Sequence, residues 1–142
     1  MKKRLYKEFT ASDDTLRIYR GDTLVFSSKK QGLLPLMEYL GGENAGKQPV
    51  TIYDKVMGNA AALLSVRAKC RQAYSPLGSE IAVATLDRHG ISHHLEKIVP
   101  YIQRADGRGM CPMEELSLGK GPEEFYEVMK ARIEAANQAE PC

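Results

Sequence analysis

The order of apolar and polar residues predicts a β-hairpin near the start of the chain, followed by a helix. Residues 16–19 and 23–27 form two β-rich runs on either side of the turn sequence Arg-Gly-Asp. Leucines and a methionine then recur at helical spacing between residues 33 and 40, where Pro35 fits the first turn. A pair of glycines directly after this pattern marks the end of the helix.

Strand-like and helix-like segments alternate along the rest of the chain. The predicted strands are 49–55, 70–75 and 91–102, and the predicted helices are 58–69, 76–90 and 122–137. A hairpin followed by such alternation predicts an α/β fold with one mixed five-stranded sheet that is covered by helices on both faces. We expect a single domain over residues 1–142, with 1–14 as an N-terminal extension and 103–121 as a long loop.

Composition and charge exclude several classes of protein. Hydrophobic residues make up 43% of the chain, which is enough for one core and too much for a disordered protein. The formal net charge of +2 gives no strong signal for nucleic-acid binding. No apolar run approaches the ~20 residues that cross a bilayer, and no signal peptide follows the basic start. The three cysteines predict a cytoplasmic protein without a disulfide framework.

Four segments resemble a small prokaryotic family of domains of unknown function that has a cytidine-deaminase-like fold. They are "GLLPLMEYL", "DKVMGNAAALL", "SEIAVATLDRHGI" and "VPYIQRADGRGMCPMEEL", and together they cover most of residues 15–118. The patterns "DK-x-x-G-x-AAALL" and "R-x-DG-x-G-x-CPME" are distinctive in combination. The resemblance implies a three-layer α/β/α sandwich.

The zinc motifs of deaminases with this fold are missing from the chain. Those enzymes carry His-x-Glu or Cys-x-Glu at one helix N-terminus and Pro-Cys-x-x-Cys at a second. The corresponding segments here, "SSKKQGLLPL" and "YDKVMGNAAA", contain neither His nor Cys. Metal-ligand spacing is also absent among the other candidates, which are Cys70, His89, His93, His94 and Cys111. We therefore expect no metal, no cofactor and no nucleoside deaminase activity.

The start of the alanine-rich helix at Gly58 is the main candidate for a ligand site. Its first turn offers unpaired N–H groups and the positive end of the helix dipole, which favour a phosphate or carboxylate. Lys55 adds a cation, and Asp54 offers an acceptor for a ribose hydroxyl or an amine. In the alternative interpretation, Asp54 caps the helix, Gly58 makes the turn and the alanines pack in the core.

In the cytidine-deaminase-like fold, two helix N-termini lie side by side beyond the sheet edge, so several segments are expected to meet there. The predicted ligand-binding residues are Ser28, Lys29, Asp54, Lys55, Gly58, Asn59, Ser75, Arg104, Asp106, Cys111 and Glu114. The alternative for the last of these segments is a glycine turn at "RADGRG" and a helix start at "CPMEEL", with Cys111 as a half-buried thiol.

Three functions are consistent with these features. The first is a zinc-free domain that binds a nucleotide, a nucleotide sugar or another phosphate-containing ligand. The second is an enzyme that uses Cys111 as a nucleophile, or Asp54 with Lys55 as an acid–base pair, although no paired histidine is evident for the thiol. The third is a protein-interaction module. The edge of the hairpin also offers a surface for homodimerisation.

Overall fold

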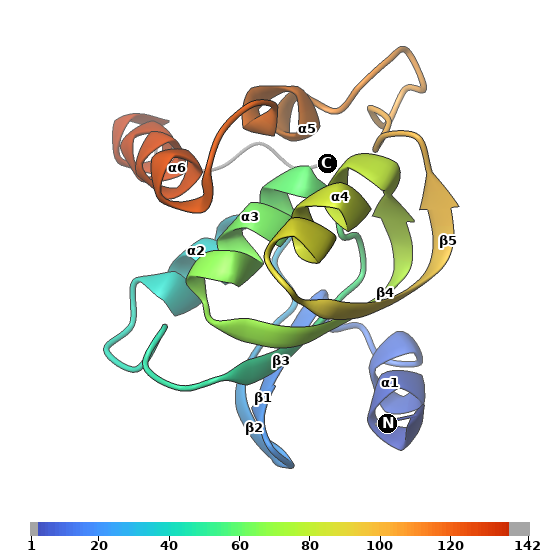
Figure 1. The fold of residues 1–142 in the computed structure, drawn as a ribbon, viewed down its shortest axis with the longest axis vertical. Coiled ribbons are helices and arrows are strands. Elements are labelled where there is room, and N and C mark those ends of the chain that lie inside the picture. The colour runs from blue at the N-terminus through green and yellow to red at the C-terminus, as the bar shows by residue number, and fades with distance from the viewer. Residues whose placement is uncertain (1–2, 137–142) are drawn as a thin grey trace.

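A mixed five-stranded sheet organises the fold in the computed structural model, which describes residues 3–136 (Figure 1). Its strands lie in the order β2-β1-β3-β4-β5. They are β1 (Leu16–Arg20), β2 (Thr23–Ser28), β3 (Val50–Asp54), β4 (Cys70–Ser79) and β5 (Ser92–Val99). The pairs β1–β2 and β1–β3 are antiparallel, whereas β3, β4 and β5 run parallel. The predicted mixed sheet that begins with a hairpin is confirmed.

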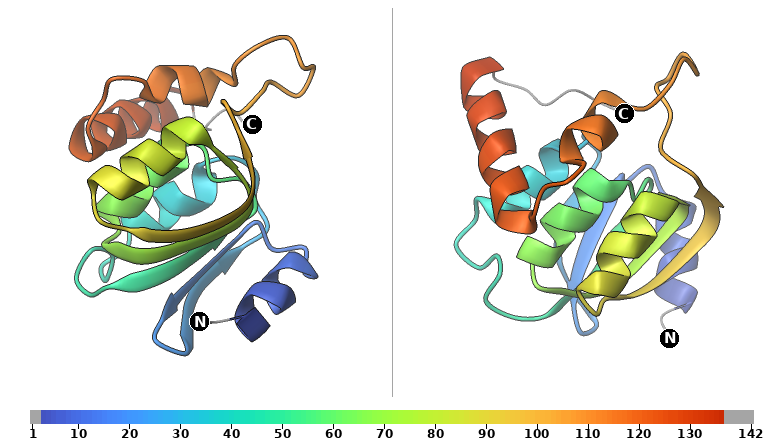
Figure 2. Two further views of the ribbon diagram at one scale, coloured as in Figure 1. Left: turned by 45° about the vertical axis from the view of Figure 1, so that its right-hand side comes forward. Right: turned by 45° about the horizontal axis from the view of Figure 1, so that its top comes forward.

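One face of the sheet carries most of the helices. Helices α2 (Leu34–Leu40), α3 (Asn59–Arg67) and α4 (Glu80–Arg88) lie on this face, with α3 between the other two (Figure 2). Helices α5 (Pro112–Ser117) and α6 (Pro122–Ala136) pack on α3 from outside. Helix α3 is therefore surrounded by protein, which explains why its residues 60–65 are all buried.

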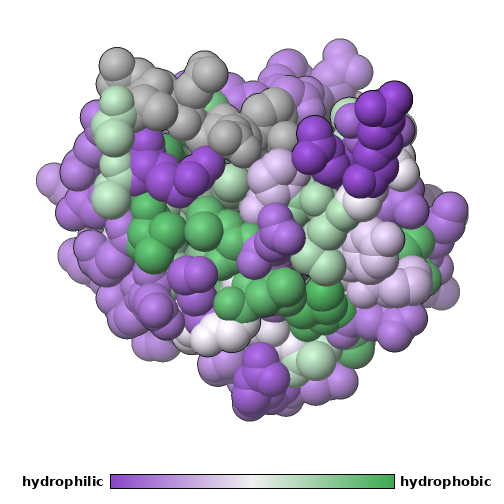
Figure 3. Space-filling model, turned by 90° about the horizontal axis from the view of Figure 1, so that it is seen from above, coloured by the Kyte–Doolittle hydropathy of each residue, from purple (hydrophilic) through white to green (hydrophobic). Residues whose placement is uncertain are grey.

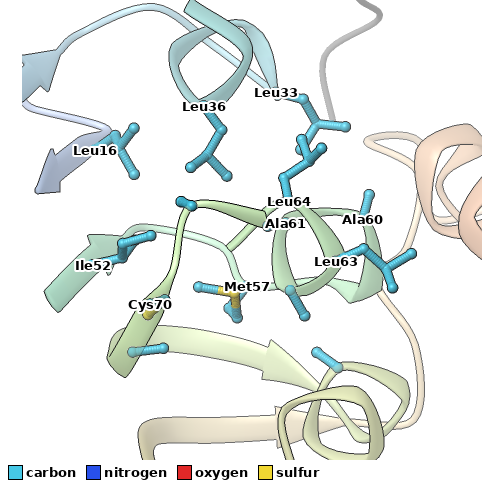
Figure 4. Packing of buried hydrophobic residues seen from close by; sticks show 14 of the residues in the cluster. Leu16, Leu33, Leu36, Ile52, Met57, Ala60, Ala61, Leu63, Leu64 and Cys70 are labelled. Atoms are coloured by element: carbon cyan, nitrogen blue, oxygen red, sulfur yellow. The ribbon is translucent and has the colours of Figure 1, made fainter. Parts of the chain in front are cut away.

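The apolar positions that predicted the first of these helices form part of the core. Leu33, Leu36, Met37 and Leu40 are all buried, as their helical spacing predicts. Figure 4 shows Leu33 and Leu36 near the alanines and leucines of α3, which lie over the sheet. The small side chains at the start of α3 allow its backbone to approach the sheet closely.

A short helix that the sequence did not indicate covers the opposite face of the sheet. Helix α1 (Lys3–Thr10) lies within the segment that was expected to be an extension. Its Tyr6 and Phe9 pack with Leu5 against three sheet tyrosines, Tyr19, Tyr53 and Tyr74. The hydroxyl of Tyr6 also donates a hydrogen bond to Glu96 on β5. The predicted cover on both faces is thus present, and α1 provides one of its two layers.

Several predicted boundaries differ from the structure. The strand expected to end at residue 75 continues to Ser79, and α4 begins after Ser79 because its Oγ accepts from the Ala82 N–H at 3.0 Å. The segment 103–121, expected as a loop, contains α5. Helix α6 matches the prediction for 122–137 as far as residue 136, while residue 137 and Cys142 lie outside the described residues. None of the described helices is long and apolar enough to span a membrane.

The substitution Phe9→Ala measures how much α1 contributes to the fold. Phe9 is fully buried, and its ring centroid lies 6.0 Å from that of Tyr53. We expect the free energy of unfolding, measured by urea denaturation, to fall by about 3–5 kcal/mol. The control Thr10→Ala changes an exposed residue of the same helix and should stay within about 0.5 kcal/mol. Similar small effects for both variants would show that α1 is not part of the folded unit.

Candidate functional site

A pocket of about 80 Å³ lies at the carboxyl end of β3, where the segment before α2, the start of α3 and the segment around α5 meet. On this side of the molecule, apolar side chains are exposed among polar ones (Figure 3). The pocket is lined by Thr15, Gln31, Gly32, Leu33, Asp54, Lys55, Val56, Gly58, Ala60, Ala61, Ile102, Cys111, Met113 and Glu114. Asp54, Lys55, Gly58, Cys111 and Glu114 were predicted from the sequence, and the structure brings these five together.

The carboxylate of Glu114 occupies the start of α3. Its Oε1 accepts from the Asn59 N–H at 2.6 Å and its Oε2 accepts from the Ile102 N–H at 2.8 Å, and the residue is only 2% exposed. A negative group therefore satisfies an unpaired helix N–H and lies at the positive end of the dipole. The protein's own side chain takes the position where the sequence analysis placed the phosphate or carboxylate of a ligand.

Gly58 leaves the space that Glu114 needs. A Cβ atom at this position would lie 3.0 Å from Glu114 Oε1 and 3.0 Å from Ile102 Cγ1. Glycine is needed here because a side chain would collide with Glu114 and Ile102. The backbone conformation does not require it, because a φ of −83° is accessible to any residue. The alternative in which Asp54 caps α3 is not what the structure has, because Glu114 supplies the cap.

Asn59 joins three helices and does not face the pocket. Its side-chain amide donates to Ser117 Oγ at 2.9 Å and to the Ser117 carbonyl at 3.3 Å, and its Oδ1 accepts from the Thr85 hydroxyl. These bonds connect α3 with α4 and α5 inside the protein, where Asn59 is 4% exposed. Asn59, predicted as a ligand-binding residue, is therefore a buried structural link.

Asp54 lines the pocket, and its carboxyl group is not paired with the neighbouring Lys55. Its Oδ1 accepts from the Val56 N–H at a long 3.4 Å, and no described residue forms an ion pair with it. Burial raises the pKa of Asp54 from the ordinary 3.8 to about 7, against the lowering effect of two backbone N–H bonds. The ammonium of Lys55 donates instead to the Ser12 carbonyl at 2.8 Å and lies 4.8 Å from the centre of the Phe9 ring.

Comparison with known proteins places the chain in a family. The family model of a domain of unknown function, DUF1893, matches residues 4–133. The chain belongs to the DUF1893 family. A crystal structure at 2.70 Å resolution of a DUF1893 family protein from Thermotoga maritima is similar, with 27% identity and a TM-score of 0.80. That similarity covers 92% of this chain and 88% of the other. No curated protein matches the chain.

The other predicted site residues of this DUF1893 protein lie away from the pocket. Lys29 pairs with Asp14 at 2.8 Å, and Arg104 pairs with Asp106 at 3.5 Å on an exposed loop. Ser75 is buried, and its hydroxyl donates to the Leu77 carbonyl at 2.8 Å. Ser28 accepts a hydrogen bond from the N–H of Lys30 and does not line the pocket. These residues satisfy neighbouring groups of the protein, which local sequence does not reveal.

The structure corrects the expectation for Cys111. Its side chain is only 1% exposed, so it is not half-buried, and its sulfur is disulfide-bonded. It therefore offers no free thiol in this form, whereas Cys70 is a free, buried cysteine. No group of three or more His, Cys, Asp or Glu side chains within residues 3–136 is arranged to hold a metal ion.

The pocket residues that sequence reasoning missed are mainly apolar or backbone groups. Gln31 and Gly32 come from "SSKKQG", which was expected near the site, but the prediction selected the serine and lysine of that segment. Ile102 and Met113 lie on either side of Cys111 in the chain and form part of the apolar wall of the pocket. Their apolar character signals burial, and only the packing of α5 on α3 shows that they border a pocket.

Glu114→Gln tests the carboxylate cap of α3. The amide replaces one acceptor oxygen by a donor, which then faces a buried N–H, and it removes the charge at the helix start. We expect the free energy of unfolding to fall by about 1–3 kcal/mol in urea denaturation. Glu115→Gln, at the exposed neighbouring position, should change it by less than about 0.5 kcal/mol. Equal stabilities of the two variants would contradict the capping role.

Asp54→Asn tests the buried carboxyl through the pH dependence of stability. Between about pH 4 and pH 7, folded Asp54 holds a proton that the unfolded chain releases, so wild-type stability falls as the pH rises through this window. The asparagine variant lacks this loss, so we expect it to gain on the order of 2 kcal/mol relative to wild type between pH 4 and pH 8. Urea denaturation at several pH values measures the gain. Asp106→Asn is the control, and an identical pH profile for both variants would refute the assignment.

Proposed function

We propose that this DUF1893 protein is a zinc-free ligand-binding domain with a cytidine-deaminase-like fold. We further propose that the pocket beside Asp54 takes the nitrogen-bearing end of a small organic molecule, such as the amine edge of a nucleobase. The sheet that begins with an antiparallel hairpin supports the fold assignment. So does the pocket, because the segment before α2 and the start of α3 both line it, as the resemblance implies.

The charges in the pocket carry the choice of ligand. Two hydrogen bonds and the dipole of α3 already satisfy Glu114, whereas Asp54 meets only backbone N–H groups and forms no ion pair with any described residue. A phosphate entering the pocket would meet both carboxyl groups, and the ammonium of Lys55 is bound elsewhere. An N–H donor is favoured instead, because Asp54 can accept its hydrogen bond. The nucleotide proposed from the sequence would therefore enter by its base and not by its phosphate.

The size and walls of the pocket suit one end of a flat molecule. A volume of about 80 Å³ is far below the roughly 300–1,000 Å³ of sites that enclose a whole drug-sized ligand. The apolar side chains of Leu33, Val56 and Ile102 offer surface to a ring. Ala60 and Ala61 lie in the first turn of α3, where N–H groups lack an intrahelical acceptor. The N–H groups of Ala60 and Ala61 can donate hydrogen bonds to a ring nitrogen or a carbonyl oxygen next to the amine of the ligand.

Proton transfer by Asp54 is the second candidate function. A pKa of about 7 places this carboxyl near the range where an acid or base works best at neutral pH. Lys55 is not its partner, because the lysine bonds to Ser12. The version with Cys111 as nucleophile requires a thiol that the disulfide-bonded form lacks. A role as an interaction module, dimerisation through the edge of β2 and a cytoplasmic location stay predictions.

Titration of ¹⁵N-labelled protein with four compounds tests the ligand assignment. We expect cytosine, cytidine and cytidine monophosphate to shift the amide signals of Val56, Ala60 and Ala61, and inorganic phosphate to leave them unchanged. Asp54→Asn should weaken cytosine binding about tenfold, because a hydrogen bond to a charged group is lost. Asp106→Asn should bind as wild type does. The proposal fails if none of the bases binds, or if phosphate alone shifts these signals.

A further inference from the structure

A second, larger hollow lies at the opposite end of the parallel strands. It has a volume of about 590 Å³ and is lined by the starts of β3 and β4, the turn between α4 and β5 and the hairpin tip at Gly21. This volume lies in the range of small-molecule sites. None of the described residues that line it is acidic, in contrast to the pocket that contains Asp54 and Glu114. The two ends of the sheet therefore differ in the charge that they present.

Arg71 brings a cation without a counter-charge to this hollow. It is exposed at the start of β4, and its guanidinium forms no hydrogen bond or ion pair with any residue of the described range 3–136. The neighbouring Gln72 also lines the hollow, and its amide adds a donor. An Arg guanidinium binds phosphate or carboxylate oxygens through strong, charge-assisted hydrogen bonds.

The acidic residues nearest in sequence to the hollow have other partners. Asp87, in the last turn of α4, bonds to His93 at 2.9 Å. Asp22 follows Gly21 and also has an interaction partner. Within residues 3–136, neither of these two acidic side chains forms an ion pair with Arg71.

Lys69 has an unusual backbone conformation beside Arg71. Its φ of +67° is left-handed, and among the described residues it is the only non-glycine residue with a positive φ. It directly follows Ala68 at the end of α3, where glycine is favoured because a Cβ atom is strained in this conformation. The chain thus keeps a strained, exposed lysine next to the lining residues Cys70 and Arg71.

We infer that this hollow is a second ligand site, which binds the phosphate group of a small molecule through Lys69 and Arg71. The two cations that flank Cys70 in the chain meet the phosphate, and the polar hollow accommodates the remainder of the molecule. The site is separate from the pocket at Asp54 and does not depend on what binds there. It takes the anionic chemistry that Glu114 and Asp54 exclude from the other end of the sheet.

Binding of pyrophosphate and adenosine monophosphate, followed by amide shifts in ¹⁵N-labelled full-length protein, tests this site. We expect both to shift Lys69, Arg71 and Gly90 in a saturable manner, and adenosine, which lacks phosphate, to leave them unchanged. Arg71→Gln should weaken binding about tenfold. Lys130→Gln removes an exposed lysine of α6 as a matched control and should bind as wild type does.

Lys69→Gly separates a ligand role from a purely structural one. Glycine removes the backbone strain, so the melting temperature should rise by about 3 °C, while phosphate binding falls about tenfold. A rise in melting temperature with unchanged binding would overturn the role of Lys69. Absence of saturable shifts, or equal weakening by Lys130→Gln, would show only non-specific attraction of anions to surface cations and would overturn the site.

Discussion

The buried carboxylate of Glu114 at the start of α3 determines how the end of the domain that contains the Asp54 pocket is built. Helix α3 lies in the middle of the protein, so its first N–H groups have little access to water, and unmet groups there would cost stability. Glu114 meets one of them and also binds the N–H of Ile102, which ties the segment after β5 to α3. Gly58 makes room for it, and Asn59 then holds α5 in place through Ser117. The pocket exists because these contacts position α5 above it.

The same contact decides the electrostatic character of the pocket. Glu114 uses the positive end of α3, and the second carboxyl group, Asp54, forms no ion pair with any described residue. Burial raises the pKa of Asp54. The nearest lysine does not compensate, since Lys55 bonds to the Ser12 carbonyl and lies over Phe9 of α1. A helix on the far face of the sheet thus affects the charge of the pocket. The position of the Lys55 ammonium depends on α1, which carries Phe9.

The two ends of the parallel strands present opposite chemistry. The carboxyl end, where α/β folds usually bind ligands, combines Asp54 and Glu114 with apolar walls. The amino end holds a larger polar hollow with Arg71 and the strained Lys69 near it. A net charge of +2 hides this separation, because composition averages over the whole surface. Under the two proposals, the base of a nucleotide would suit the carboxyl end of the strands, and its phosphate would suit the amino end.

The sequence by itself determined the hairpin, the alternation of strands and helices and the buried face of α2. It also identified Asp54, Lys55 and Gly58, which line the pocket. These features depend on local periodicity, turn residues and helix signals, which act between residues close in the chain. Helix α1 was not predicted because it is only eight residues long, although Leu5, Tyr6 and Phe9 do lie on one helical face. The tyrosines of the sheet explain why this face is buried. The local sequence also predicts where the free N–H groups of a helix start lie, but it does not predict which acceptor binds them. That choice was made by tertiary structure, since Glu114 reaches the Asn59 N–H from 55 positions along the chain, while Lys55 turns toward Ser12.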